Sequence, residues 1–212
     1  MGDPVDFRQE DSIYRPIVAF DFDGTLTVRD TFTAFLAWRA GPFRYRAGLA
    51  RLLPNLVRYL RDHDRGRLKA AAVRRFLAGS SRADMEDASR RFAEGRARTL
   101  LRPDAIRAWR RWQSQSARLV IVTACPEEIV APFARGLGAD SLFGTRLAYD
   151  ENDRLTGDLA GENCRGPEKV SRLKEAFGPD VRLEAAFGDT DGDKEMLALA
   201  DQAGYRVFED TP

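Results

Sequence analysis

Cysteine is scarce in this sequence, since Cys125 and Cys164 are the only two among 212 residues. Two thiols so far apart form neither a disulfide framework nor the paired spacing of a zinc site. No uninterrupted apolar run approaches the ~18 residues that a membrane-spanning helix needs. Residues 1–14 are polar and acidic, which predicts a flexible lead-in rather than a signal peptide. We therefore expect a cytoplasmic protein with reduced thiols.

Lysine is also rare, because only four of the 34 basic residues are lysines and the others are arginines. The net charge is +1, but residues 39–75 hold eleven basic and two acidic side chains, a local charge of +9. Such an excess predicts contact with an anionic partner, such as an anionic membrane surface or a nucleic acid. Few aromatic residues alternate with these arginines and no nucleic-acid-binding motif is present, so nucleic acid is the less favoured partner.

Three apolar runs predict buried strands, at 16–21, 118–124 and 183–190. Residues 30–111 are rich in alanine, leucine and arginine and poor in β-branched residues, which predicts a helical block with a break at Pro54 among others. The polar turn at Asp150–Asp153 predicts a hairpin over 145–159. We also expect a helix over 194–204 and a short last strand over 205–208.

Buried strands that alternate with helices predict an α/β protein with a doubly wound parallel sheet, the Rossmann-like arrangement. We assign residues 15–30 and 112–212 to this core. The helical block, residues 31–111, follows the first strand directly. It is therefore predicted to form a helical cap domain inserted over the sheet.

Acidic residues mark the ends of the first and third predicted strands. Asp21 and Asp23 stand one residue apart after the first strand, and Asp189 follows the third. Ligand sites in open parallel sheets form at the carboxyl ends of strands, so we expect these carboxylates to converge. Two like charges this close repel each other unless a cation lies between them, and carboxylate oxygens suit Mg²⁺. The pattern predicts a Mg²⁺ site.

Three further residues complete a set that suits phosphate chemistry. Thr123 ends the second strand and offers a hydroxyl, while Lys169 precedes the third strand and offers a positive charge. Gly24 allows a tight turn that presents backbone N–H groups to an anion. A metal, a cation, backbone donors and a carboxylate nucleophile are what phosphoryl transfer requires. The expected partner is therefore a phosphorylated substrate.

Four parts of the sequence carry a family resemblance: "DFDGTLT" at 21–27, Thr123, "GPEK" at 166–169 and "GDTDGD" at 188–193. They resemble the four motifs of the haloacid dehalogenase superfamily of phosphatases. The motif order, the helical insertion and the hairpin look most like the phosphoserine phosphatase branch (subfamily IB). Residues 22–32 are also similar to bacterial phosphatidylglycerophosphatases of this branch. The resemblance covers nearly the whole chain from Arg15 onward and implies a phosphoric monoester hydrolase.

The resemblance implies a catalytic role for each matching residue. Asp21 is expected to be the nucleophile that forms an aspartyl-phosphate. Asp23 is expected to protonate the leaving alkoxide and then to act as the base that activates water. Thr123 and Lys169 are expected to hold phosphoryl oxygens.

The same resemblance implies a Mg²⁺ site with three ligands, which are Asp21, the backbone carbonyl of Asp23, and Asp189. Asp193 is expected to orient metal-bound water or Lys169. Gly24 and Thr25 are expected to contribute to phosphate binding.

Two features bear on the substrate. Asp30 lies nine positions after Asp21, where phosphoserine phosphatases hold an acidic residue against the amino group of the substrate. An N-cap for a helix that begins near Thr31 is an equal alternative. Residues 49–60 carry leucines at helical spacing, with arginines on another face. This pattern fits either a cap helix packed on its neighbours or an interfacial helix that meets anionic lipid.

Several functions stay open on this basis. The first is a Mg²⁺-dependent phosphomonoesterase for a phospholipid head-group phosphate, such as phosphatidylglycerophosphate, at the inner face of the membrane. The second is a phosphatase for a soluble metabolite such as phosphoserine. A more remote alternative is a phospho-accepting signalling receiver, which also combines acidic residues, Thr and Lys. The long helical insertion and the second acidic pair, Asp189 and Asp193, count against a receiver.

Overall fold

The computed structural model describes residues 15–212. A five-stranded sheet has the order β3-β2-β1-β6-β7, and all its neighbouring strands are parallel. Its strands are β1 (Ile17–Phe20), β2 (Arg118–Pro126), β3 (Ser141–Thr145), β6 (Leu183–Gly188) and β7 (Ala200–Tyr205). The predicted hairpin is an antiparallel pair, β4 (Leu147–Tyr149) and β5 (Leu155–Leu159). The predicted α/β doubly wound fold is confirmed.

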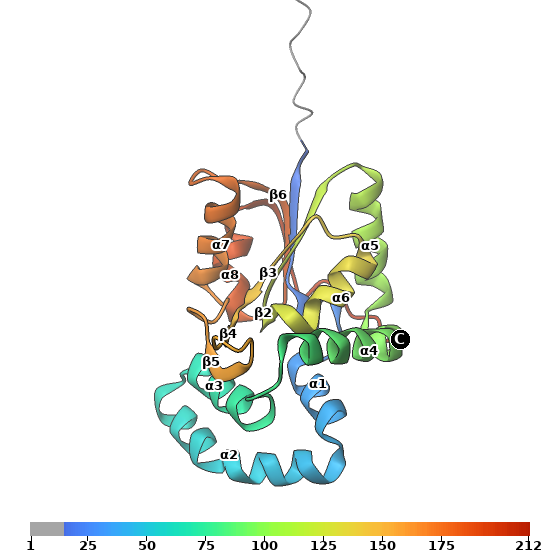
Figure 1. Ribbon diagram of the computed structural model, residues 1–212. Coiled ribbons are helices and arrows are strands. Elements are labelled where there is room, and N and C mark those ends of the chain that lie inside the picture. Colours follow the sequence, from blue (N-terminus) through green and yellow to red (C-terminus); the bar gives the residue numbers. More distant parts are fainter. Residues whose placement is uncertain (1–14) are drawn as a thin grey trace, which may run out of the picture.

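Helices cover both faces of the sheet (Figure 1). One face carries α5 (Pro103–Ser114) and α6 (Glu127–Leu137), and the other carries α7 (Pro167–Phe177) and α8 (Lys194–Leu197). Successive side chains of β1 point to opposite faces, because Val18 and Phe20 belong to one buried cluster and Ala19 to the other. A strand buried on both faces needs the continuous apolar run that the sequence has here.

The chain between β1 and β2 is helical. Before α5 it forms α1 (Thr31–Ala40), α2 (Pro42–Asp62), α3 (Arg65–Phe76) and α4 (Arg82–Leu100). Figure 1 shows α2 as the helix farthest from the sheet. By contrast, α4 contacts α6, with Phe92 and Phe133 ring centroids 6.1 Å apart, and α5 contacts the sheet, with Trp109 5.1 Å from Phe20. Helix α1 also packs against α4, with Phe35 and Phe92 ring centroids 5.4 Å apart, and the assignment of residues 31–111 to a cap stays a prediction.

Helix α2 runs unbroken through Pro54, where a break was expected. It lies close to α3 at Gly48, because a Cβ atom there would overlap the ring of Phe76. Elsewhere α2 exposes large apolar side chains, including Phe43, Leu53, Val57 and Leu60. Within residues 15–212 no helix combines the length and the apolar character needed to cross a membrane. The exposed apolar face of α2 therefore needs another explanation.

Two expectations near the C-terminus were wrong. The helix predicted over 194–204 ends at Leu197, and the last strand is Ala200–Tyr205 rather than 205–208. Pairing with β6 overrides the helical propensity of this segment, with Leu183 opposite Ala200. Gly204 permits the close pairing, since a Cβ there would overlap the ring of Phe187. Strand β3 was not predicted at all.

Candidate active site

The predicted catalytic residues lie together at the carboxyl end of the sheet. Asp21 and Asp189 directly follow β1 and β6, Thr123 lies near the end of β2, and Lys169 is in the first turn of α7. The Asp21 N–H donates to the Phe187 carbonyl at 2.8 Å, which fixes the end of β1 against β6. One cavity of about 480 Å³ is lined by all four residues that are expected to be catalytic, Asp21, Asp23, Thr123 and Lys169, and also by Asp189. Because β1 lies between β2 and β6, residues distant in sequence converge there.

Lys169 is the centre of a buried ion-pair network. Its Nζ donates to Asp21 Oδ1 at 2.5 Å, to Asp193 Oδ1 at 2.6 Å and to the Val122 carbonyl at 2.6 Å. The side chain is almost fully buried, with 1% of the residue exposed. Burial by itself lowers the pKa of Lys169, but the two carboxylates outweigh it and raise the pKa overall. Lys169 is therefore a fixed cation that orients Asp21.

Asp21 and Asp23 both have raised pKa values. Burial is the largest cause for each, and it raises the pKa of both carboxyls to about 7. Lys169 opposes this shift at Asp21, whereas the charge of Asp30 adds to it at Asp23. The Thr31 N–H donates to Asp23 Oδ1 at 2.8 Å and so holds the Asp23 carboxyl near the start of α1. A carboxyl that titrates near neutral pH can both give and take a proton.

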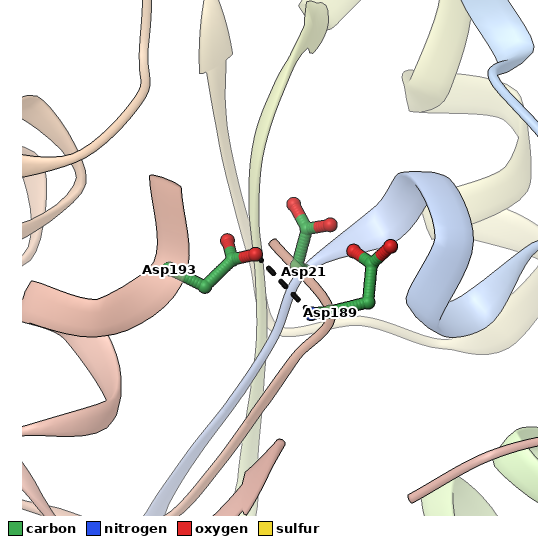
Figure 2. A group of neighbouring side chains, drawn as sticks. All are labelled: Asp21, Asp189 and Asp193. Carbon is green, nitrogen blue, oxygen red and sulfur yellow. Dashed lines mark hydrogen bonds between the residues drawn. The ribbon is translucent and has the colours of Figure 1, made fainter. Parts of the chain in front are cut away.

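Three carboxylates form a group of oxygen atoms that could hold a metal ion. Figure 2 shows Asp21, Asp189 and Asp193, which each offer an oxygen within 4.8 Å of the other two. Burial and the charge of Asp193 raise the pKa of Asp189. Burial would also raise the pKa of Asp193, but Lys169 and hydrogen bonds from Thr190 lower it on balance. An all-oxygen donor set of this kind suits a hard cation such as Mg²⁺.

Asp193 differs from the other two carboxylates, because backbone and side-chain donors already occupy it. The Asp189 N–H donates to Asp193 Oδ2 at 3.2 Å (dashed in Figure 2), and the Thr190 N–H donates to the same oxygen at 2.9 Å. The other oxygen accepts from Lys169. The position of Asp193 is compatible with the implied role of orienting Lys169, and that role stays a prediction.

The turn after Asp21 places Gly24 and Thr25 beside Asp189. Gly24 has a positive φ of 82°, and a Cβ atom there would overlap the Asp189 carboxylate. Only glycine fits this backbone conformation and this close approach. The Thr25 hydroxyl donates to Asp189 Oδ1 at 3.4 Å, and Thr25 is not among the residues that line the catalytic cavity. Phosphate binding by Thr25 stays a prediction, since its hydroxyl is directed to a carboxylate.

Asp30 caps a helix and also lies at the catalytic cavity. It is the N-cap of α1, with Oδ1 accepting from the Thr33 N–H at 2.6 Å. It also lines the catalytic cavity. The helix-capping role is therefore confirmed, and contact with a substrate stays a prediction.

The chain as a whole is similar to known proteins. Residues 18–198 match the family model of haloacid dehalogenase-like hydrolases. The chain belongs to this family. It is 61% identical to protein CicA of Caulobacter vibrioides over 196 residues, which cover 92% of this chain and 88% of CicA.

Solved structures share the fold at lower sequence identity. A protein of unknown function from Bordetella pertussis Tohama I has a TM-score of 0.74 and 21% identity, and the match covers 89% of this chain and 88% of that one. A phosphoserine phosphatase in its apo form has a TM-score of 0.60 and 21% identity, over 91% and 86% of the two chains. The predicted superfamily, the fold of the phosphoserine phosphatase-like branch and the expectation of an enzyme are confirmed.

Sequence reasoning missed several cations of this hydrolase site. The residues concerned line the catalytic cavity, and they are Arg29, Arg65, Lys69, Arg102 and Arg165. Lys69, on α3, donates from Nζ to Asn163 Oδ1 at 2.7 Å and also to the Ala124 carbonyl, so it ties α3 to strand β2 and to the loop before α7. Burial lowers the pKa of Lys69. A signal existed, because Lys69 is one of only four lysines in a chain that favours arginine.

Proposed function

We propose that this hydrolase is a phosphomonoesterase that works through an aspartyl-phosphate on Asp21. The observation that carries the proposal is the arrangement of Asp21 and Asp23 in one cavity, with Asp21 held by the buried Lys169. In its ionised form Asp21 is the nucleophile, and Lys169 keeps one of its oxygens in place while the other is available for attack. Lys169 and the Thr123 hydroxyl hold phosphoryl oxygens.

Asp23 carries the proton in both halves of the reaction. In the first half, its protonated carboxyl gives a proton to the leaving alkoxide as Asp21 bonds to phosphorus. In the second half, the Asp23 carboxylate takes a proton from the water that attacks the phosphorus, which releases phosphate and restores the Asp21 carboxylate. The pKa of about 7 allows Asp23 to occur in both forms near neutral pH. The Thr31 N–H holds the carboxyl in position through both steps.

We propose Mg²⁺ as the cofactor, held by Asp21, Asp189 and the backbone carbonyl of Asp23. The donor set supports this assignment, because the oxygens of Asp21 and Asp189 lie close together and Asp193 is already occupied by donors. When bound, Mg²⁺ neutralises negative charge on the phosphoryl group and on the carboxylates. Asp193 contributes by holding Lys169 and the backbone of Asp189.

Adding Mg²⁺ is expected to raise the Tm more at about pH 8 than at about pH 5.5. In the folded, metal-free chain the pKa of Asp21 and Asp23 is about 7, against a usual value of 3.8. Between pH 3.8 and about pH 7 the folded state binds more protons at Asp21 and Asp23 than the unfolded state does. The stability that these bound protons contribute is therefore lost as the pH rises. Mg²⁺ needs the ionised ligands and competes with these protons at the lower pH.

Thermal unfolding with and without MgCl₂ at the two pH values measures this difference. Asp189→Asn serves as a control that removes one proposed ligand, and it should abolish most of the Mg²⁺-dependent shift. An equal shift at both pH values would contradict the coupling between metal and protons.

We propose a phospholipid head-group phosphate, such as phosphatidylglycerophosphate, as the substrate. Helix α2 supports this choice, because exposed apolar side chains lie on it beside exposed arginines. Phe43 is 85% exposed and Leu60 is 65% exposed, while Arg51 and Arg58 are exposed as well. An amphipathic helix with apolar and basic faces binds anionic membranes by burying the first and attracting lipid with the second. Residues 39–75 would then hold the site at the membrane surface.

One observation favours a second candidate, a phosphatase for a soluble ester such as phosphoserine. The Asp30 carboxylate lines the catalytic cavity and could accept hydrogen bonds from a substrate amino group. A solved phosphoserine phosphatase also has this fold. A receiver that only holds its phosphoryl group has no such support, since the family match is to hydrolases.

Phosphate release from phosphatidylglycerophosphate in anionic vesicles, beside release from phosphoserine, distinguishes the two substrates. The double variant Arg51→Glu/Arg58→Glu is expected to lower vesicle binding and release from vesicles by at least about 30-fold, since each of the two lost surface cations contributes about 1 kcal/mol. The matched control, Arg110→Glu/Arg111→Glu, changes the same charge on α5 and should leave both unchanged. Turnover of phosphoserine alone would exclude the lipid substrate.

A further inference from the structure

A second cavity, lined mainly by apolar side chains, lies next to the catalytic cavity. Its volume is about 600 Å³, and α1, α2 and α3 form its walls. Six leucines line it: Leu36, Leu49, Leu52, Leu53, Leu56 and Leu68. Among the described residues that line the cavity, none is acidic. This volume is typical of a site for a small-molecule ligand.

The apolar cavity adjoins the catalytic cavity. Both are lined by Phe32, Arg65 and Lys69, which therefore lie at the junction between them. Phe32 belongs to α1 close to Asp30, while Arg65 and Lys69 belong to the first two turns of α3. A ligand that extends through both cavities would place an anionic group near the cations and an apolar group among the leucines.

We propose that the apolar cavity holds the hydrocarbon chain of the substrate while the catalytic cavity holds its phosphate. The substrate class is therefore a phosphomonoester with an alkyl or acyl chain, a step that rests on the proposed phosphatase function. The walls that it shares with the catalytic cavity favour this occupant over a bilayer surface or a second copy of the chain, neither of which would need a site next to the catalytic cavity. The exposed leucines of α2 form the entrance, with Leu53 56% exposed and Leu36 on the opposite wall almost fully buried.

The test uses monoalkyl phosphates of increasing chain length, from butyl to decyl, below their micelle concentrations and without vesicles. Moving one methylene group from water into an apolar site favours binding about fourfold. We expect kcat/KM for phosphate release to rise at least about tenfold from butyl to decyl phosphate. A membrane-binding surface would give no such rise, because no membrane is present.

Ala72→Phe places an aromatic ring into the cavity from α3, and Ala72 lies outside the catalytic machinery. This variant should lose the preference for decyl phosphate and keep the wild-type rate on butyl phosphate. Ala83→Phe, at an exposed position of α4, is the matched control and should keep the preference. If Ala72→Phe fails to fold, Leu53→Gln at the exposed entrance tests the chain-binding site in its place. This variant should lower kcat/KM for decyl phosphate at least about threefold.

Each outcome separates this proposal from the proposed function. Equal kcat/KM for butyl and decyl phosphate overturns the chain-binding site and leaves the phosphatase function standing. Release from none of the esters overturns the phosphatase function itself. A loss of vesicle binding or of self-association in Ala72→Phe, with the chain-length preference intact, would assign the cavity to a membrane or to a second copy and overturn the proposal.

Discussion

Replacing Asp21 with Asn is expected to lower phosphate release by at least about 10⁴-fold, the scale on which the loss of a nucleophile is measured in other hydrolases. The amide has nearly the shape of the carboxylate but cannot attack phosphorus. Lys169 keeps its hydrogen bonds to Asp193 and to the Val122 carbonyl, so the buried cation stays paired. The variant should therefore fold, and the loss should appear in kcat.

Mass spectrometry of acid-quenched reactions provides the second measurement. Wild-type protein should carry one additional phosphoryl group during turnover, and Asp21→Asn should carry none. The matched control is Asp201→Asn, at an exposed position of β7 that does not line the catalytic cavity, and it should keep full activity. Substantial activity in Asp21→Asn would place the nucleophile elsewhere and reject the proposed mechanism.

Replacing Lys169 with Met is expected to reduce both the stability and the activity of the protein. Lys169 is the buried partner of Asp21 and Asp193, and removing one member of a buried ion pair typically costs about 3–5 kcal/mol of unfolding free energy. The loss of a fixed cation at the phosphoryl oxygens should lower kcat by about 10³-fold. Denaturant unfolding and steady-state kinetics measure the two effects.

The stability loss in Lys169→Met should be larger at about pH 8 than at about pH 5.5. Without the ammonium group, the pKa of Asp193 is expected to rise, because Lys169 opposes the effect of burial more than the hydrogen bonds from Thr190 do. A carboxyl whose pKa is higher in the folded than in the unfolded state loses its stabilising contribution as the pH rises through the folded value. Lys174→Met, on the exposed side of α7, is the matched control and should show neither effect. A pH-independent loss would mean that packing, not charge, is what Lys169 supplies.

The sequence was sufficient to predict the residues that converge on the active site. Asp21, Thr123 and Asp189 each stand at or directly after the end of an apolar run, and parallel strands bring such ends to one edge. Lys169 could be predicted because its neighbours resemble a family motif. Each of these residues can therefore be recognised from its immediate neighbours in the sequence, even though the residues are distant from one another along the chain.

The apolar cavity and its cations could not be predicted in the same way. The leucine spacing of α2 indicated an apolar face, but not which helix or space that face would meet. That outcome depends on contacts such as Gly48 against Phe76, where the absence of one Cβ atom sets the approach of two helices. The limits of the last strand were also missed, because pairing with β6 outweighs the local preference of residues 200–204.

The central position of β1 has a consequence for how the chain is made. The ribosome synthesises β1 first among the strands, but Ile17 pairs with Arg118 and Val18 pairs with Ala185, so its two neighbours emerge much later. At about 5–20 residues per second, the apolar strand that precedes Asp21 waits several seconds for its first partner and longer for its second. During translation it is an exposed hydrophobic segment, suited to chaperone binding, and Asp21 acquires its surroundings only when most of the chain has left the ribosome.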